Sequence, residues 1–211
     1  MDQQTIEFYN SEAENVVRLH STLTPQRIYQ LISRYFVPGG KTVDIGCGTG
    51  RDTHWLNQQG FPTFGIDGSV EMLKFAQSFY PGDVFLQDYL PDLKVLSDLR
   101  FQNILCSAVL MHLSKVDLKP ACDRLLQLLD DNGCLIISFR GTNEINHREN
   151  GKLYESILVA DFVMIFNENG CDVLVQESEL EISRNLVWHN VVICNTQKIN
   201  INQSPAFCLV S

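Results

Sequence analysis

Three glycines at alternate positions form the most informative chemical feature of this sequence. They are Gly46, Gly48 and Gly50, and Asp44 stands two residues before the first of them. Glycine permits a positive φ and lets a ligand approach the backbone where any Cβ would keep it away. The N–H groups of a helix that starts at this point favour a negative ligand group, whereas a carboxylate at Asp44 attracts a cation and opposes a pyrophosphate. The spacing G-x-G-x-G also differs from the dinucleotide pattern G-x-G-x-x-G, because Arg51 occupies the position of the third glycine. We therefore expect a ligand with a cationic amino-acid end, and the alternative is a tight turn that binds nothing.

This glycine loop resembles motif I, D/E-x-G-x-G-x-G, of the class I S-adenosylmethionine-dependent methyltransferases. The resemblance continues through Asp67 at the end of the next strand-like run, through the run from Ser69 to Ala76, and through the segments 101–113 and 132–135. It covers residues 40–194 in all. Gln102-Asn103 and Asn132-Gly133 depart from the family's frequent Phe-Asp and Gly-Gly.

One absence narrows the resemblance within that family. Ser107 to Leu110 stand where enzymes that methylate the amino group of adenine or glutamine carry Asn/Asp-Pro-Pro-Tyr. The segments Gly50 to Asp52 and Gly60-Phe61 instead resemble the small-molecule branch, which includes the thiopurine and tellurite-resistance methyltransferases.

The resemblance implies a set of residues that bind S-adenosylmethionine. It implies that backbone groups bind the methionine part of the cofactor and that Asp67 binds the ribose. It also implies that Gly68, Met72 and Asp88 contact the adenine. Carbonyl groups at the end of the fourth strand would accept hydrogen bonds from the ammonium group. It also implies that a tyrosine in the N-terminal segment closes over the cofactor. The residues in question are Tyr9, Asp44, Gly46, Cys47, Gly48, Gly50, Asp67, Gly68, Met72, Asp88, Tyr89, Cys106 and Ser107.

Methyl transfer from a sulfonium needs little from the protein beyond approach geometry and the exclusion of water. A general base is required only when the acceptor must lose a proton of high pKa. His112, just beyond the fourth strand, is the catalytic residue that we predict, and a structural histidine at a helix start is the alternative. His147, with Arg140, Arg148 and Tyr154, is a second candidate group, for shaping an acceptor pocket, and a solvated loop is the alternative.

Short apolar runs alternate with amphipathic segments along the chain, which predicts an α/β fold. We expect a doubly wound, mostly parallel, seven-stranded Rossmann-like sheet with an antiparallel C-terminal hairpin and an N-terminal helical lid. The strands are expected at 42–45, 64–66, 84–86, 101–108, 134–139, 171–176 and 186–194, and the helices at 51–59, 71–80, 115–130 and 153–167. Residues 140–151 are predicted to be a long loop. We expect a single domain over 1–211, with a lid at 1–36 broken near 21–25, a cofactor-binding core at 40–194 and an unassigned tail at 195–211.

The composition limits the partners and the location. Sixteen Lys plus Arg against 25 Asp plus Glu give a net charge of −9, which repels phosphate backbones and predicts no nucleic-acid partner. The seven cysteines form no C-x-x-C pair, so we expect no metal site. The sequence begins without a signal-peptide pattern and contains no apolar run of membrane-spanning length. We expect a cytoplasmic protein with no membrane partner, and the sequence does not indicate an oligomeric state.

The function predicted from these features is transfer of a methyl group from S-adenosylmethionine to a small-molecule acceptor by in-line displacement. Two other classes stay open at this point. One is a non-catalytic binding or regulatory module on a methyltransferase fold, because no residue here is uniquely catalytic. The other is an NAD-dependent oxidoreductase, which the glycine spacing and Asp44 disfavour. Methylation of protein or RNA is disfavoured by the size and the charge of the chain.

Overall fold

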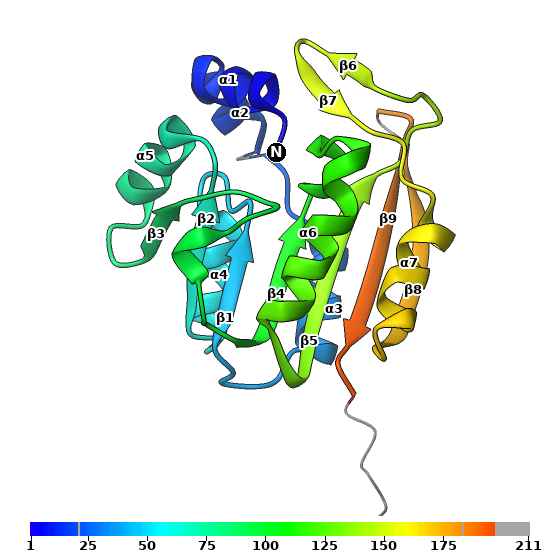
Figure 1. Ribbon diagram of the computed structural model, residues 1–211. Coiled ribbons are helices and arrows are strands. Elements are labelled where there is room, and N and C mark those ends of the chain that lie inside the picture. The colour runs from blue at the N-terminus through cyan, green and yellow to red at the C-terminus, as the bar shows by residue number, and fades with distance from the viewer. Residues whose placement is uncertain (21, 183, 197–211) are drawn as a thin grey trace, which may run out of the picture.

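A seven-stranded sheet forms the centre of the molecule (Figure 1). The computed structural model describes residues 1–20, 22–182 and 184–196, so most of the predicted tail at 195–211 lies outside the described residues. The strand order is β3-β2-β1-β4-β5-β9-β8. The strands are β1 (Thr42–Ile45), β2 (Thr63–Asp67), β3 (Val84–Gln87), β4 (Phe101–Ser107), β5 (Leu129–Arg140), β8 (Asp172–Glu181) and β9 (Leu186–Cys194). Pairing is parallel from β3 to β5, and β9 is antiparallel to both β5 and β8. The predicted fold class is confirmed.

The chain reverses its direction of winding at β1. This strand pairs with β2 on one side and with β4 on the other, so the connections that leave the carboxyl ends of β1 and β4 run toward opposite edges of the sheet. Ligands of open α/β sheets bind outside the carboxyl ends of the strands at such a switch point. The glycine loop begins directly after β1 and therefore lies at this point.

Helices cover both faces of the sheet, and alternate residues of each strand pack against one layer or the other. Ile104 and Ile137 belong to the cluster that contains Leu125 of α6 (Lys115–Leu128) and Phe166 of α7 (Val159–Glu168). The intervening strand residues belong to the opposite cluster, built on α3 (Gln26–Tyr35) and α4 (Arg51–Gln58); its members include Leu105, Ile136, Leu31, Ile32 and Leu56. Figure 1 shows α6 and α7 on the near face and α3 behind the sheet. The two clusters hold the strands, and with them the ends of the strands, in fixed positions.

Local signals set the ends of the helices beside the site. α5 (Val70–Phe79) is capped by Ser69, whose Oγ accepts a hydrogen bond from the N–H of Met72 at 3.2 Å. α4 begins after Gly50 and ends before Gly60, which has φ +84° in the position where helices commonly end on glycine. Both helices therefore start within a few residues of a strand's carboxyl end.

The N-terminal segment forms two helices, α1 (Gln3–Ser11) and α2 (Ala13–His20), above the carboxyl edge of the sheet (Figure 1). The predicted break near 21–25 is present in the described residues 22–25, and a second break at Glu12 was not predicted. There the N–H of Glu12 donates to the carbonyl oxygen of Phe8 and closes α1. The segment that was expected to act as a lid is therefore two short helices followed by α3, which packs on the sheet.

The region 140–158 differs from the prediction. Residues 147–154 form a hairpin of β6 (His147–Glu149) and β7 (Lys152–Tyr154), and the next helix starts only at Val159. The helix predicted from 153 was wrong because the apolar residues Leu153 and Tyr154 are buried as hairpin residues. Leu153 uses its N–H to donate to Oγ1 of Thr5 at 2.9 Å, so this hairpin packs against α1.

Two smaller differences concern the connections around β4 and β5. β4 is followed by the short helix η2 (Leu110–His112), and another, η1 (Lys94–Leu96), precedes it. β5 begins at Leu129, where the helix predicted at 115–130 had been expected to continue, and the strand contains an irregularity at Asn132, which has φ +59°. These details do not alter the position of the strand ends that face the site.

Candidate functional site

The backbone of the glycine loop is fixed by close packing from outside the loop. Gly46, Gly48 and Gly50 have φ values of +77°, +54° and +77°. A Cβ at Gly46 would lie 2.1 Å from Cγ2 of Val109, and a Cβ at Gly50 would lie 2.6 Å from the Phe85 ring. Both positions therefore require glycine for steric reasons as well as for φ. The N–H groups of Gly46 and Cys47 donate to the carbonyl oxygen of Ile66 at 2.7 and 2.9 Å, which ties the loop to β2.

Asp67 connects the glycine loop to the turn after β2. Its Oδ2 accepts from the N–H of Gly48 at 2.8 Å, and its Oδ1 accepts from the N–H of Ser69 at 2.8 Å. Burial raises the pKa of Asp67, while these backbone hydrogen bonds act to lower it. Each carboxylate oxygen has a further lone pair. Asp67 can therefore accept hydrogen bonds from a ligand without releasing the loop.

Asp44 lies beneath the loop. Its side chain is buried, and its Oδ2 accepts from Oγ1 of Thr53 in the first turn of α4 at 2.7 Å. Burial, followed by the nearby charge of Asp52, raises the pKa of Asp44 to about 7. The described contacts of Asp44 orient α4 and the loop from below, and its predicted attraction for an ammonium group stays a prediction.

A cavity of about 530 Å³ opens above the loop, between the carboxyl ends of the strands and the N-terminal helices. This volume lies within the range of small-molecule sites. Eleven of the fourteen residues predicted for the site line it: Tyr9, Gly46, Cys47, Gly48, Asp67, Gly68, Met72, Asp88, Tyr89, Ser107 and His112. The structure brings these residues together from segments that are more than a hundred residues apart in the sequence.

Asp44, Gly50 and Cys106 do not line the cavity. Gly50 is the N-cap of α4 and packs against Phe85. Cys106 is fully buried within β4, and burial raises the pKa of its thiol. These three residues shape the surroundings of the cavity from positions behind its wall.

The loop after β3 is closed by Asp88. Its Oδ1 accepts from the N–H of Tyr89 and its Oδ2 from the N–H of Val95, both at 2.8 Å. Tyr89 is 42 % exposed at the rim of the cavity. The predicted contact of Asp88 with an adenine amino group would use the lone pairs that these turn bonds leave free.

His112 is held in one orientation and one protonation state. Its Nδ1 lies 2.5 Å from the carbonyl oxygen of Leu153, and its Nε2 lies 3.3 Å from the hydroxyl oxygen of Tyr9. A carbonyl oxygen only accepts, so Nδ1 carries the proton and Nε2 accepts from Tyr9. Burial lowers the pKa of His112 to about 4, and burial raises the pKa of Tyr9. The imidazole is therefore neutral near pH 7, with its basic nitrogen directed toward Tyr9 and the cavity.

The N-terminal helices form the roof of the cavity and are attached at several points. Thr5, Ile6 and Tyr9 of α1 line it. Asp2 binds Arg148 of the hairpin at 2.7 Å, and this ion pair lowers the pKa of Asp2 to about 2. On the other side, Oγ of Ser69 donates to Oδ1 of Asn10 at 2.7 Å. The lid expected at the N-terminus is thus in contact with both sides of the cavity.

The group predicted to shape an acceptor pocket does not line the cavity, so that prediction was wrong. Arg140 binds Glu149 with both terminal nitrogens and stacks on the ring of Tyr154, and His147 lies 2.6 Å from Glu144. The prediction failed because these polar residues pair with one another within the hairpin. Their hairpin instead supports α1.

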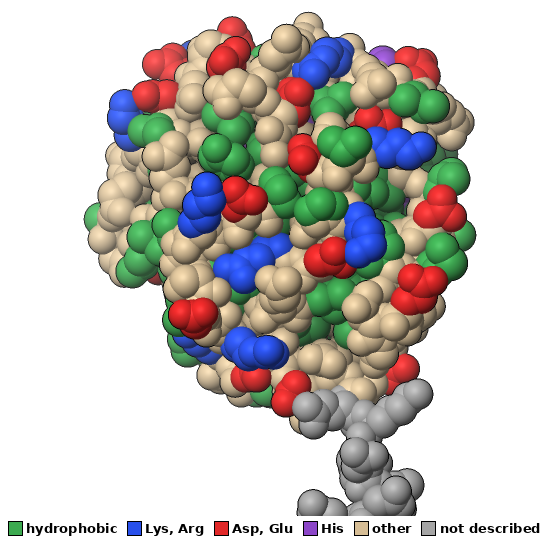
Figure 2. All heavy atoms as spheres, in the orientation of Figure 1, with side chains coloured by type: hydrophobic (Ala, Val, Ile, Leu, Met, Phe, Trp, Pro, Cys, Tyr) green, Lys and Arg blue, Asp and Glu red, His purple; other side chains and the backbone are tan. Residues whose placement is uncertain are grey.

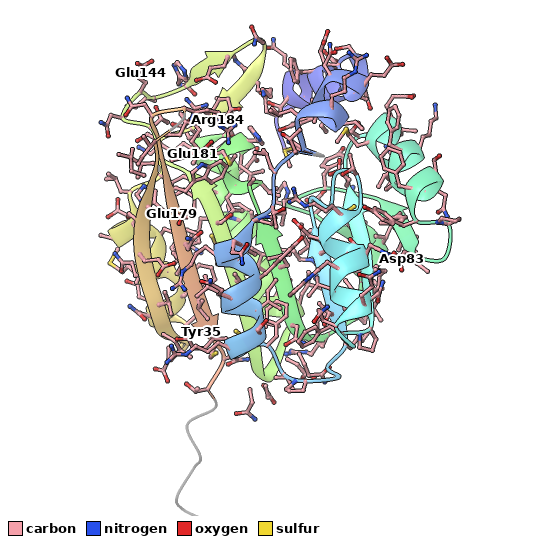
Figure 3. The ribbon with its side chains drawn as sticks, turned by 180° about the vertical axis from the view of Figure 1, so that it is seen from behind. Tyr35, Asp83, Glu144, Glu179, Glu181 and Arg184 are labelled. Carbon is pink, nitrogen blue, oxygen red and sulfur yellow. The ribbon has the colours of Figure 1, made fainter. Side chains whose placement is uncertain are left out.

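The wall opposite the glycine loop comes from β8, β9 and the turn between them, and none of its residues was predicted from the sequence. It includes Glu179, Leu180, Glu181, Arg184, Trp188 and Asn190. Figure 3 shows Glu179, Glu181 and Arg184 along this edge of the sheet, below the N-terminal helices. The available signals were the alternation of glutamates along 177–181 and a single buried Asn190 within an otherwise apolar strand.

The described residues contain no group of three or more His, Cys, Asp or Glu side chains placed to hold a metal ion. None of the helices in the described ranges combines the length and the apolar character that a membrane span requires. On the face drawn in Figure 2, acidic and basic side chains of the described residues are interspersed.

Comparison with known proteins agrees with this geometry. Residues 43–137 match the family model of a methyltransferase domain. A relative from Geobacillus sp. (strain WCH70) that carries a methyltransferase name is 26 % identical over 125 residues, which are 57 % of this chain and 51 % of the relative. The chain thus spans about half the length of the curated relatives it matches.

Solved structures share the fold over a larger part of the chain. A 1,6-didemethyltoxoflavin-N1-methyltransferase from Burkholderia thailandensis, with S-adenosylhomocysteine bound, aligns with a TM-score of 0.72 at 16 % identity, covering 92 % of this chain and 88 % of that one. Magnesium protoporphyrin IX methyltransferase from Synechocystis PCC 6803, with S-adenosylmethionine bound, aligns with a TM-score of 0.72 at 20 % identity, covering 93 % and 98 %. These comparisons confirm the resemblance to S-adenosylmethionine-dependent methyltransferases that the sequence indicated.

Proposed function

We propose that this chain, whose residues 43–137 match the family model of a methyltransferase domain, transfers a methyl group from S-adenosylmethionine to a small-molecule acceptor. The observation that supports this most directly is the cavity of about 530 Å³ whose floor is the positive-φ glycine loop and whose side is Asp67. The three arginines in the described part of its wall are each paired with a carboxylate, and the described residues contain no group placed to hold a metal ion.

The residues of the floor fit the cofactor. A Cβ at Gly48 would meet only Cε of Met72, at 3.6 Å, so the backbone at Gly48 borders open space. Gly46, Cys47 and Gly48 would hold the methionine part, and Asp67 would accept hydrogen bonds from the ribose hydroxyls. Met72 is 1 % exposed and lines the cavity, which suits an adenine contact. S-adenosylmethionine supplies an activated methyl group on a positively charged sulfur.

The protein's own contribution to the reaction would be to position the acceptor, exclude water and hold a proton. The α1 roof lines the same cavity as Ser107 and His112 and would exclude water from the space beside them. Nε2 of His112 is unprotonated and would take a proton that the acceptor loses, if Tyr9 turns its hydroxyl away or passes the proton on. With a pKa near 4, His112 is a weak base, so this role suits an acceptor whose own pKa falls as the new bond forms.

The test is turnover of S-adenosylmethionine carrying a labelled methyl group over a panel of thiols, phenols, amines and N-heterocycles. We expect at least one small acceptor to be labelled and S-adenosylhomocysteine to be released in equal amount. Binding of S-adenosylhomocysteine without turnover on any acceptor would instead support the non-catalytic alternative.

A substitution of His112 separates proton transfer from cofactor binding. His112→Gln keeps a side-chain donor and acceptor but cannot take a proton. A loss of turnover with unchanged S-adenosylhomocysteine affinity is expected if His112 acts as the base. If His112→Gln turned over as fast as the unchanged protein across pH 6–9, His112 would only position Tyr9 and Leu153.

A further inference from the structure

Glutamates at alternate positions of β8 form one part of the cavity wall that the proposed function leaves unexplained. Glu177, Glu179 and Glu181 follow one another at spacing two, so their side chains leave the same face of the strand. Two of the three, Glu179 and Glu181, line the cavity. Three carboxylates in such a row repel one another unless cations lie between them.

The outer two glutamates have guanidinium partners. Nε and Nη2 of Arg27 donate to the two oxygens of Glu177 at 2.6 and 2.7 Å. Arg184 donates to both oxygens of Glu181. Glu179, between them, forms no ion pair among the described residues, and its one hydrogen bond comes from Nδ2 of Asn190 at 3.5 Å. The row therefore has three carboxylates and two cations.

The cationic groups of the described cavity wall are already bound to other residues. The terminal ammonium of Met1 donates to the carbonyl oxygen of Leu90 at 2.9 Å and lies 3.7 Å from Asp117. Besides Arg27 and Arg184, the arginine of the described wall is Arg51, which donates to both oxygens of Asp52 at 2.8 and 2.9 Å and to the carbonyl oxygen of Leu23 at 2.9 Å. Each guanidinium in the wall is thus already bound at two points. A carboxylate or phosphate on the acceptor would have to break one of these pairs and would face Glu179.

An aromatic ring lies beside the unpaired carboxylate. Trp188 of β9 is the cross-strand partner of Glu179, and its Nε1 donates to Oε2 of Glu181 at 3.0 Å, which fixes the indole. Both Glu179 and Trp188 line the cavity. A carboxylate and an indole face together favour an organic cation through charge and cation–π attraction.

We infer that the acceptor carries a cationic nitrogen group, such as an ammonium or amidinium, that binds between Glu179 and Trp188. This inference rests on the proposed function, since it names the class of molecule that enters the same cavity. The bound cation is not the atom that is methylated, because a protonated nitrogen has no lone pair to attack a methyl group. The methylated atom belongs to another part of the acceptor, directed toward His112.

Two aromatic probes that differ in charge test the inference. Binding of 2-phenylethylamine and of 3-phenylpropanoate is measured by tryptophan fluorescence, with and without saturating S-adenosylhomocysteine. The Trp188→Phe variant assigns the signal, since Trp55 is the other tryptophan of the chain. We expect the amine to bind about tenfold more tightly than the acid, the effect of one organic cation site.

Matched variants decide whether Glu179 is responsible. Glu179→Gln should reduce the preference for the amine to about twofold or less, and Glu168→Gln, an exposed glutamate at the end of α7, should leave it unchanged. A preference for the acid, an equal preference in Glu179→Gln, or no binding of the amine at millimolar concentration would overturn the inference. Failure of S-adenosylhomocysteine to bind would instead contradict the proposed function, because the charge preference is also measured without it.

A second, independent inference concerns two cysteines at the opposite end of the sheet. Cys134 of β5 and Cys194 of β9 are direct partners in the antiparallel ladder. The N–H of Asn195 donates to the carbonyl oxygen of Gly133 at 3.0 Å, and its carbonyl oxygen accepts from the N–H of Asn132 at 2.7 Å, so Asn195 is hydrogen-bonded across a bulge. Cys134 and Cys194 follow it as the adjacent non-hydrogen-bonded pair. Residues in such a pair have Cα atoms about 4.5 Å apart, within the range that a disulfide spans.

The two thiols differ in a way that suits oxidation. Cys194 is partly exposed, and hydrogen bonding from the Cys134 thiol lowers its pKa. Cys134 is buried, and the same hydrogen bond raises its pKa. The more accessible sulfur is therefore also the more readily ionised one, which is the property of a reactive thiol.

We propose that Cys134 and Cys194 form a cross-strand disulfide when the protein meets hydrogen peroxide. The Cys194 thiolate attacks one peroxide oxygen, the O–O bond breaks, hydroxide leaves, and Cys194 becomes a sulfenic acid. The Cys134 sulfur then attacks the Cys194 sulfur, loses its proton, and displaces the hydroxyl group as water. Two thiols are oxidised and one peroxide is reduced to two waters.

Peptide mapping of the peroxide-treated full chain under non-reducing conditions tests this proposal. We expect a cross-linked Cys134–Cys194 peptide that lacks two hydrogen atoms, which forms in Cys171→Ser and does not form in Cys194→Ser. Cys171 is the matched control because it precedes Asp172, which also pairs with Cys194. A disulfide of Cys194 with Cys171 or Cys208 instead, or stable sulfinic acid at Cys194 with no disulfide, would overturn it.

Discussion

The two walls of the cavity are built in different ways. The wall under the glycine loop consists of backbone held by other backbone and by Asp67, and the steric fit at Gly46 and Gly50 leaves no space for a side chain. The opposite wall consists of side chains on β8 and β9 that are held by ion pairs, and Glu179 at its centre is exposed. A wall of backbone accepts one ligand geometry, whereas a wall of surface side chains can be altered without disturbing the fold. The first wall suits an invariant cofactor and the second suits a specific acceptor.

The largest effect is expected from a methyl group at the centre of the backbone wall. Gly46→Ala places a Cβ 2.1 Å from Val109 in a residue with φ +77°. We expect a loss of about 2–4 kcal/mol in the free energy of unfolding and at least about a hundredfold loss of S-adenosylhomocysteine affinity. Chemical denaturation and calorimetry measure the two quantities.

Two further variants show whether the close approach is the cause. Gly60→Ala has a similar φ of +84° with no atom within 4 Å of the new Cβ, so it should cost about 1 kcal/mol and leave affinity unchanged. Adding Val109→Ala to Gly46→Ala should restore part of the stability. If Gly46→Ala bound S-adenosylhomocysteine as tightly as the wild type, the glycine loop would tolerate side chains. The backbone wall would then be no more constrained than the side-chain wall.

The next effect concerns the carboxylate of the backbone wall. Asp67→Asn replaces one acceptor oxygen by a donor that faces the N–H of Gly48 or Ser69, so one buried donor loses its partner. We expect about a 10- to 100-fold loss of S-adenosylhomocysteine affinity, measured by calorimetry. An unchanged affinity for S-adenosylhomocysteine would show that Asp67 does not contact the cofactor.

The free energy of unfolding is expected to depend on pH through His112, which lies beneath the N-terminal helices. The pKa of His112 is lowered to about 4 by burial, against an ordinary value near 6.5. The unfolded chain therefore binds a proton between pH 6.5 and about 4 that the folded protein excludes. The stability due to neutral His112 is complete above pH 6.5 and is lost as the pH falls toward 4.

The variant His112→Gln isolates this contribution. Asp44 acts in the opposite direction, because its raised pKa of about 7 makes the folded state less stable as the pH rises from its ordinary value toward 7. The difference in unfolding free energy between wild type and His112→Gln cancels the Asp44 contribution. We expect this difference to change by about 3 kcal/mol between pH 6.5 and pH 4. A difference that is constant over this range would mean that His112 is not buried in its neutral form.

The smallest effect is expected where the hairpin supports the lid. Arg148→Gln removes the ion pair with Asp2, which is partly exposed. We expect a two- to fivefold loss of S-adenosylhomocysteine affinity at low salt and a smaller loss at 0.5 M salt, because exposed ion pairs are worth less than about 1 kcal/mol and are screened. Lys119→Gln, which removes an exposed pair with Asp123 on α6, is the control and should not change affinity. A loss of affinity that does not respond to salt would exclude an electrostatic support of the lid.

The sequence predicted the sheet and the backbone wall because both depend on local signals. The strand, the three glycines and the following helix stand within twenty residues, and Asp67 follows the next strand directly. The clash that makes Gly46 obligatory comes from Val109, sixty-three residues later, yet the glycine itself is visible in the sequence.

The hairpin and the side-chain wall could not be predicted for a physical reason. Arg27 and Glu177, which pair in the second wall, are 150 residues apart, and no local pattern marks them as partners. Apolar residues at 153, 154 and 157 have the spacing of a helix, but the first two belong to a hairpin whose shape is set by contact with α1. The polar residues at 140–149 indicated a binding loop. In the structure they pair with one another, and the sequence alone does not show this pairing.

Calorimetric titration of the intact protein with S-adenosylhomocysteine, and separately with NAD, tests the central claim most directly. The positive-φ loop, Asp67 and the cavity above them predict saturable binding of S-adenosylhomocysteine with one site per chain, a rise in melting temperature that grows with ligand concentration, and neither effect with NAD. Binding of NAD, or no binding of S-adenosylhomocysteine at millimolar concentration, would contradict the account.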